Sequence, residues 1–180
     1  MKKLLLLFVF SFALLSGCVQ NRSDELTVEQ IAKEKAKVMD VIKAYNLAYQ
    51  NEKFSEIIET LSEDVVFFGT DSVEVIRSLS EFKKLIQNQW NTYDIKYGEM
   101  VDTWVLMDKQ GRLASVVFGV PAVVKNVTKG TEERLFFRIA RTLKQQNSKW
   151  VIASGIVGIT QVMSGANATP DANTPVEPVK

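Results

Sequence analysis

The chain carries two kinds of side chain whose chemistry suits a small-molecule site. One is an arginine in a predicted strand, and the other is a pair of carboxylates that lie close to each other in the sequence. Arg138 lies in a segment that alternates with a period of two residues, so its neighbours divide between two faces. One face holds Arg134, Phe136, Arg138, Ala140 and Thr142, and the other holds Leu135, Phe137, Ile139, Arg141 and Leu143. A guanidinium in a pocket presents a planar fork of donors to a carboxylate, phosphate or carbonyl group. The alternative for Arg138 is an ion pair or a surface charge.

The two carboxylates, Asp71 and Glu74, follow a brief β-rich run at Val65–Gly69. A carboxylate that aromatic neighbours desolvate can act as a general base. The same segment could instead form a turn or a cap, because Asp and Ser side chains bond to nearby backbone amides. Both interpretations stay open at the level of sequence.

Large rings form the third group of candidates, since aromatic side chains can line a pocket for an apolar ligand. The six rings considered are Tyr45, Tyr49, Trp90, Tyr93, Trp104 and Trp150. Each such ring buries roughly 150–250 Å² when it packs in a core. We favour core packing for Trp90 and Trp150. For Tyr45 and Tyr93 the two roles are nearly balanced, because each hydroxyl needs a polar partner or water.

The composition excludes several kinds of mechanism. The 180 residues include no His and a single Cys, so a Ser-His-Asp or Cys-His mechanism and a His-based zinc or iron site are ruled out. Lys and Arg number 22 against 21 Asp and Glu, which gives no basic footprint for nucleic acid. Glycine-rich phosphate loops, calcium loops and metal-spaced carboxylates are also missing from the sequence, so we expect neither a metal nor a cofactor.

The first eighteen residues predict export and lipidation. Two lysines precede the apolar stretch Leu4–Leu15, which is too short for a bilayer core of about 20 residues but suits a signal peptide. The Leu-Ser-Gly-Cys sequence that ends at Cys18 resembles the bacterial lipobox, which implies that Cys18 is lipidated and becomes the first mature residue. We therefore expect a bacterial envelope protein held at a membrane by acyl chains. Val19 gives no inner-membrane retention signal, so the periplasmic face of the outer membrane is expected where the cell has one.

The chain divides into four parts. Residues 1–17 are expected to be the signal peptide, 18–26 the lipidated Cys and its tether, and 27–163 the folded domain. The tail, 164–180, has three of the four prolines and no aromatic residue, which predicts disorder.

The folded part begins with helices and continues with long strands. Thr27 and Gln30 form a predicted capping box for a helix that runs to about Gln50, and apolar residues recur in it at steps of three and four. We predict further helices over 54–61 and 78–90, and strands over 65–69, 96–107, 112–124, 132–144 and 149–161. Pro121 marks an edge or a bulge in its strand. Helices followed by an antiparallel meander predict an α+β domain whose sheet curls over the helices.

Two segments of the sequence resemble a known protein superfamily. Residues 41–71 resemble the opening of the nuclear transport factor 2-like, SnoaL-like superfamily, and residues 138–155 resemble its closing hairpin, with an Arg-led strand, a polar turn and a Trp. The resemblance covers about residues 28–161. It implies a cone, in which a strongly curved sheet surrounds helices and leaves a pocket at the open end. It also implies that Arg138 points into the cone. Many members carry a His after the closing Trp, where this chain has Ser154.

These observations favour a non-catalytic lipoprotein. Its cone would bind a small apolar or amphiphilic ligand, or a partner protein, and the resemblance implies a homodimer through the sheet. The candidate pocket residues are Arg138, Tyr45, Tyr49, Trp90, Tyr93 and Trp104. The alternative is a His-free isomerase, cyclase or dehydratase, with Asp71 or Glu74 as the base, Tyr45 or Tyr93 as the proton donor and Arg138 orienting the substrate.

Overall fold

The computed structural model describes residues 25–162. The expected signal peptide, the lipidated Cys18 and the expected disordered tail lie outside these residues. The described helices are α2 (Val28–Gln50), α3 (Phe54–Glu59) and α4 (Leu79–Thr92). The strands are β1 (Leu61–Phe68), β2 (Val75–Ile76), β3 (Tyr93–Tyr97), β4 (Val101–Met107), β5 (Leu113–Asn126), β6 (Glu132–Gln146) and β7 (Lys149–Val162). Within this part of the chain, no helix has both the length and the apolar character needed to cross a membrane.

The helices begin where the sequence predicts them. The Thr27 hydroxyl accepts from the Gln30 backbone N–H, and the Gln30 side chain accepts from the Thr27 backbone N–H, which confirms the capping box. Ser78 caps α4 by accepting from the backbone N–H of Glu81. Both caps satisfy amides that a helix start leaves unpaired. The buried residues of α2 recur at helical spacing and face the sheet: Val38, Ile42, Tyr45, Ala48 and Tyr49.

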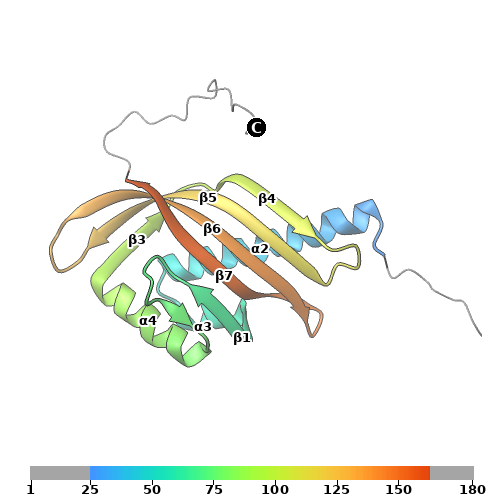
Figure 1. Cartoon of the computed structure of the whole chain (residues 1–180), viewed down its shortest axis with the longest axis horizontal. Coiled ribbons are helices and arrows are strands. Elements are labelled where there is room, and N and C mark those ends of the chain that lie inside the picture. Colours follow the sequence, from blue (N-terminus) through green and yellow to red (C-terminus); the bar gives the residue numbers. More distant parts are fainter. Residues whose placement is uncertain (1–24, 163–180) are drawn as a thin grey trace, which may run out of the picture.

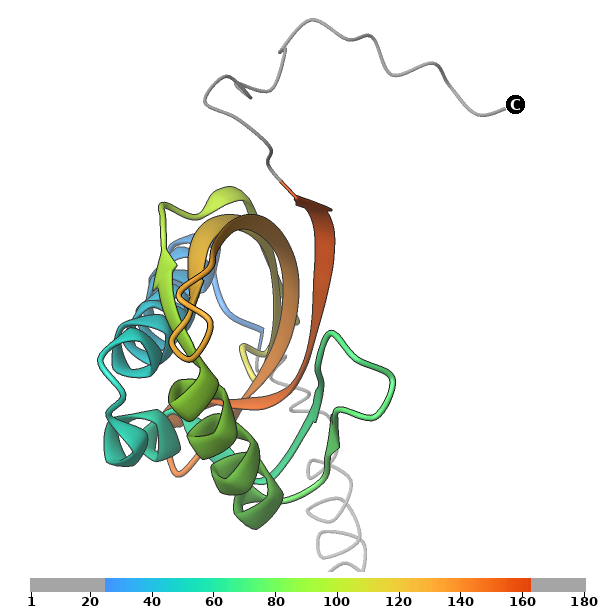
Figure 2. The same cartoon turned by 90° about the vertical axis from the view of Figure 1, so that its left-hand side faces the viewer.

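The strands form one sheet in the order β2-β1-β7-β6-β5-β3, and β4 also pairs with β5 (Figure 1). All pairings are antiparallel except that of β1 with β7, which is parallel. The long strands β5, β6 and β7 bend strongly, and the helices lie against the inner side of the bend (Figure 2). This curled α+β roll confirms the predicted fold class.

One predicted strand, over residues 96–107, is two strands in the structure. β3 and β4 pair with opposite halves of β5, and the chain breaks between them at Gly98. The Gly98 N–H donates to the Pro121 carbonyl at 2.8 Å, and a Cβ at Gly98 would lie 3.0 Å from the Pro121 ring. The N–H and carbonyl of one strand residue face the same neighbour, so the missing N–H of Pro121 faces this break. The edge predicted at Pro121 is therefore present on this side alone, because the pairing of β5 with β6 runs through Pro121 without a shift. The prediction of a single strand over 96–107 is wrong.

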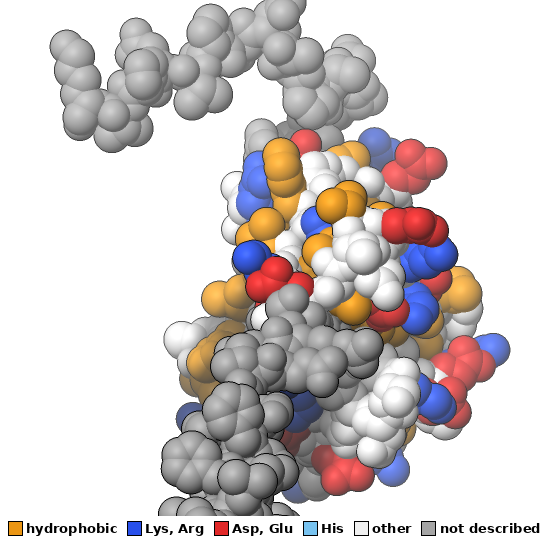
Figure 3. All heavy atoms as spheres, turned by 90° about the vertical axis from the view of Figure 1, so that its right-hand side faces the viewer, with side chains coloured by type: hydrophobic (Ala, Val, Ile, Leu, Met, Phe, Trp, Pro, Cys, Tyr) orange, Lys and Arg blue, Asp and Glu red, His pale blue; other side chains and the backbone are white. Residues whose placement is uncertain are grey.

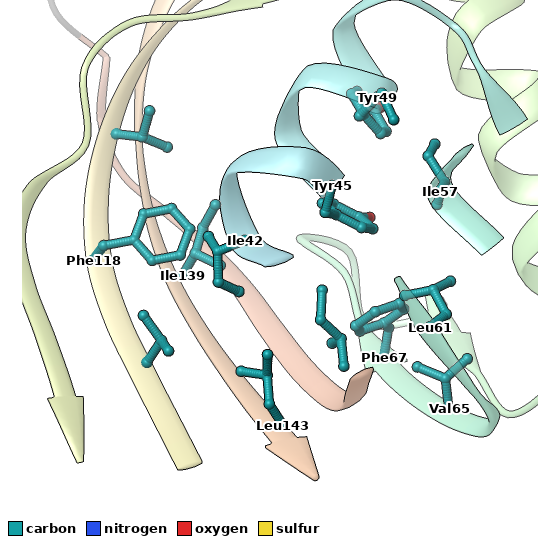
Figure 4. Close-up of a cluster of buried hydrophobic side chains, with 14 of the residues drawn as sticks. Ile42, Tyr45, Tyr49, Ile57, Leu61, Val65, Phe67, Phe118, Ile139 and Leu143 are labelled. Carbon is teal, nitrogen blue, oxygen red and sulfur yellow. The ribbon is translucent and has the colours of Figure 1, made fainter. Parts of the chain in front are cut away.

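The core lies between the inner face of the sheet and α2 (Figure 4). Alternate residues of β6 are buried against alternate residues of β5, as the pairing of Ile139 with Phe118 and Leu143 with Ala114 shows. In Figure 4, Tyr45 projects from α2 toward Phe67 of β1, and Tyr49 lies further along the helix; the ring centroids of Tyr45 and Phe67 are 6.4 Å apart. This packing fixes the positions of the rings around the cavity described next.

Candidate functional site

A cavity of about 540 Å³ lies inside the curled sheet. Its walls come from α2, α4, β1, β3, β5, β6, β7 and the loop between β1 and β2. Volumes of about 300–1,000 Å³ are typical of small-molecule sites. The lining combines rings and aliphatic side chains, such as Phe67 and Phe137, with many polar groups. The polar groups include Tyr45, Tyr49, Tyr97, the cations Arg141 and Lys129, and the carboxylates Asp71, Glu74 and Glu133.

Arg141 is the one buried cation among residues 25–162. Its side chain is only 7% exposed and lines the cavity. The guanidinium carbon lies 4.8 Å from the centroid of the Phe67 ring and 5.7 Å from that of Tyr45, distances that suit cation–π contacts. The Tyr45 hydroxyl is close enough to the guanidinium to influence its pKa, and Nη1 donates to the Ala140 carbonyl at a long 3.5 Å.

None of the carboxylates described by the structure forms an ion pair with Arg141. Burial lowers the pKa of its guanidinium, and the nearby Tyr45 and Tyr97 hydroxyls oppose this shift. A guanidinium nevertheless stays protonated at neutral pH. The cavity therefore contains a positive charge whose surroundings are rings and hydroxyls.

Local sequence explains how this side chain comes to lie there. Arg141 is on the same face of β6 as Ile139 and Leu143, and both of those are buried. Its partner on β7 is Gly155. A Cβ at Gly155 would lie 2.3 Å from Nη1 and 2.6 Å from Cδ of Arg141, so the glycine provides the space that the arginine fills.

Two tyrosine hydroxyls, those of Tyr45 and Tyr97, lie near the buried charge, and Tyr49 lines the same cavity. Burial raises the pKa of Tyr45, Tyr49 and Tyr97, and for Tyr45 the charge of Arg141 partly opposes the rise. These hydroxyls therefore stay protonated and can donate to a ligand oxygen. The Tyr49 hydroxyl already donates to the Gln89 side chain at 2.8 Å.

The rim of the cavity carries the carboxylates proposed as bases. Asp71 and Glu74 both line it, but Asp71 is exposed and accepts from the Ser72 hydroxyl and the Val73 amide. Glu74 is half-buried, and its Oε2 accepts from the backbone N–H of Thr70 at 2.8 Å and of Asp71 at 3.2 Å. Both side chains thus organise their own loop, which was the alternative interpretation of this segment.

The predicted pocket residues separate into two groups. Tyr45, Tyr49 and Tyr93 line the cavity. Arg138 does not, because it lies on the outer face of β6, exposed, with its guanidinium carbon 5.7 Å from the Phe136 ring centroid. The prediction that Arg138 points into the cone is wrong: residues three apart on a strand face opposite ways, and Arg141 occupies the inner face.

The two predicted tryptophans are also outside the cavity lining. Trp104 lies on the outer face of β4 and is 71% exposed. Trp90 packs against Tyr49, with ring centroids 6.0 Å apart, and among residues 25–162 its indole N–H is a buried donor without an acceptor. Trp90 therefore belongs to the packing around the helices, which agrees with the prediction that it is a core residue.

Sequence reasoning missed Arg141, Tyr97 and Phe67 as site residues. A signal for Arg141 was present, because it alternates with Leu135, Phe137, Ile139 and Leu143, and a strand face with so many apolar residues is the buried one. Among the described residues, no group of three or more His, Cys, Asp or Glu side chains could hold a metal ion.

Comparison with known proteins now gives the family. The model of the SnoaL-like domain matches residues 38–156, more than half of the chain. The chain belongs to the SnoaL-like family. No curated protein sequence matches it.

Solved structures support this SnoaL-like assignment through their fold. A protein provisionally named a scytalone dehydratase, from Novosphingobium aromaticivorans, has a TM-score of 0.68 at 11% identity, covering 83% of this chain and 100% of its own. A hexachlorocyclohexane dehydrochlorinase has a TM-score of 0.66 at 9% identity, covering 81% and 98%. A ketosteroid isomerase-like protein from Erwinia carotovora atroseptica has a TM-score of 0.61 at 16% identity, covering 70% and 95%. At these identities the likeness establishes the fold of this SnoaL-like domain.

Proposed function

We propose that this SnoaL-like protein is a lipid-anchored envelope protein whose cone binds a small amphiphilic anion, with the anionic oxygens at Arg141 and the apolar part among the rings. The proposal rests above all on one observation, the buried guanidinium that lacks a carboxylate partner among the described residues. In this role the protein holds its ligand without transforming it.

An unpaired buried charge is costly for a fold. Desolvation of an ion costs several kcal/mol, and an opposite charge in good geometry offsets part of that cost. A carboxylate or similar oxyanion can accept two parallel hydrogen bonds from a guanidinium. The Tyr45 and Tyr97 hydroxyls lie near enough to influence Arg141 electrostatically and supply further donors for the same oxygens.

The rest of the cavity suits an apolar skeleton. Phe67, Phe137, Ile139 and Leu135 line the same cavity as Arg141, and each is at most 8% exposed. Burying apolar area stabilises a complex by about 25 cal/mol per Å². A ligand with one anionic end and one apolar end would therefore satisfy both parts of the cavity.

The membrane part of the proposal comes from the sequence. Cys18 follows a signal-like apolar stretch and small residues, in the order that resembles a lipobox. Several acyl chains give stable anchoring where one chain is marginal.

Binding of decanoate and of decanol to the full chain provides the test, because the two probes differ chiefly in the charge of the head group. We expect decanoate to bind at least tenfold more tightly. In Arg141→Gln, the ratio of decanoate affinity to decanol affinity should fall by a factor of about 10 to 100, since hydrogen bonds to charged groups contribute about 1.5–3 kcal/mol. Arg138→Gln is the matched control, because it removes the same charge from the outer face of the same strand. Equal binding of both probes, or equal effects of the two variants, would refute the proposal.

The catalytic alternative retains one supporting observation, the position of the Glu74 carboxylate in the cavity wall. As a base, Glu74 would need to leave the two loop amides that it now accepts from. Turnover of a carbonyl substrate that Glu74→Gln abolishes would favour this alternative over simple binding.

A further inference from the structure

The outer face of the sheet carries exposed apolar side chains at one end. Trp104 and Leu106 of β4 are 71% and 66% exposed, and Leu113 and Val117 of β5 are 53% and 43% exposed. Trp104 pairs directly with Val117, and Leu106 with Ser115, so their side chains share one face. The intervening Val105 packs on the core instead. We call the four residues Trp104, Leu106, Leu113 and Val117 the β4–β5 patch.

The start of the described chain lies beside this patch. The Leu26 N–H donates to the Lys109 carbonyl at 2.8 Å, in the turn that joins β4 to β5, and the Lys109 ammonium lies 3.4 Å from the Glu25 carboxylate. A Cβ at Gly111 of the same turn would lie 2.3 Å from the Leu26 side chain. Figure 1 shows the N-terminal end of α2 next to this turn.

Six residues separate Cys18 from Glu25, and seven steps of extended chain span at most about 25 Å. A domain of about 140 residues is roughly 35–40 Å across. A lipid on Cys18 therefore cannot lie beyond the far side of the molecule, and the β4–β5 turn stays within about 25 Å of the bilayer plus its own contact with Leu26.

We infer that the β4–β5 patch docks on the lipid bilayer that holds the Cys18 anchor, an inference that rests on the lipid anchor of the proposed function. Trp side chains favour the membrane–water interface, where the ring lies among the head groups. Leu106 and Leu113 add apolar area beside it. Figure 3, which views this end, shows apolar side chains at the surface among basic and acidic ones.

This placement leaves the cavity accessible. β5 begins at Leu113, beside the tether, and ends at Asn126, which lines the cavity. Lys129 and Thr131 of the following loop also line it. Because the 14 residues of β5 follow a bent path of about 45 Å, the cavity rim and the docking patch lie at opposite ends of this strand.

Fluorescence quenching in vesicles tests the inference. The full lipidated chain is reconstituted in phosphatidylethanolamine–phosphatidylglycerol vesicles whose acyl chains are brominated near the head group. The signal of Trp104 is obtained by subtracting that of Trp104→Phe. We expect at least twofold quenching of Trp104 by the brominated lipid and protection of it from acrylamide. The control is Trp104→Phe combined with Leu47→Trp, because Leu47 is 59% exposed on α2. We expect acrylamide to quench the introduced tryptophan and brominated lipid to leave it unquenched.

The measurements distinguish the ways in which the docking inference could be wrong. A Trp104 that acrylamide quenches and brominated lipid does not would overturn docking and leave the anchor intact. A Trp104 protected from acrylamide without lipid quenching, in a way that depends on protein density, would show that a second copy covers the patch and would also overturn it. Mass spectrometry that finds Cys18 unmodified would overturn the anchor and the docking together.

Discussion

Arg141 occupies space that exists only because its partner on β7 is Gly155. A Cβ at residue 155 would come within 2.3 Å of Nη1 and 2.6 Å of Cδ of that arginine. The buried charge and the small residue therefore form one structural unit, and the position of the guanidinium in the cavity depends on both.

Gly155→Ala should displace the Arg141 side chain. Overpacking of a well-packed interior costs about 1–3 kcal/mol, so we expect a loss of that size in the free energy of unfolding, together with weaker binding of decanoate. Chemical denaturation and calorimetric titration measure the two effects. Gly158→Ala is the control, because a Cβ there would meet nothing closer than the Arg138 carbonyl at 3.9 Å. Similar losses in both variants would contradict this role of Gly155.

Glu34→Ala should destabilise the closing hairpin. The Trp150 Nε1–H donates to the Glu34 carboxylate at 2.7 Å, and Trp150 is buried. Hydrogen bonds from Lys37 and Trp150 lower the pKa of Glu34. Leaving the indole N–H without an acceptor costs about 1–3 kcal/mol. Glu29→Ala should change stability by less than about 1 kcal/mol, because its ion pair with Lys33 is exposed. A denaturation experiment in which the two variants behave alike would exclude the proposed role of Glu34.

Asp64 should contribute a stability component that disappears in acid. Hydrogen bonds from Lys144 and Ser62 lower its pKa from 3.8 to about 2. Because the folded-state pKa lies below the unfolded one, the contribution is complete above about pH 4 and is lost as the pH falls towards 2. Denaturation midpoints measured between pH 5 and pH 2 should fall more steeply for the wild type than for Asp64→Asn. Parallel curves would show that the pair adds nothing to stability.

Glu74→Ala distinguishes a loop role from a catalytic one. Its carboxylate accepts from the Thr70 and Asp71 amides, so the variant should speed hydrogen exchange at those two amides. Binding of decanoate should change by less than about threefold, since the anion site that we propose is at Arg141. Unchanged exchange at Thr70 and Asp71 would contradict the loop role.

The sequence predicted features that depend on neighbouring residues better than features that depend on contacts between distant residues. Local signals were reliable, as Thr27 with Gln30 and the alternation around Ile139 show, because a cap and a strand face are set by neighbouring residues. Alternation divides the residues of a strand between two faces, but it does not show which face lines a cavity. The family resemblance assigned the pocket role to Arg138, whereas the structure places Arg141 there.

Other features depended on contacts that sequence does not show. The break at Gly98 follows from its contact with Pro121, which is 23 residues away. The parallel pairing of β1 with β7 joins residues about 90 apart, such as Phe67 and Gly155. Trp104 appeared suited to a pocket on ring size alone, but its register with Val117 places it on the outer face. Pairing partners, more than residue types, decided which candidates reached the cavity.

A crystal structure of the protein with decanoate would show whether Arg141 receives an anionic ligand inside the cone. We expect the carboxylate at hydrogen-bond distance, about 2.7–3.2 Å, from the Arg141 guanidinium, with the alkyl chain against Phe67 and Phe137. A carboxylate bound at Lys129 on the rim, or a cavity left without decanoate under saturating conditions, would contradict it.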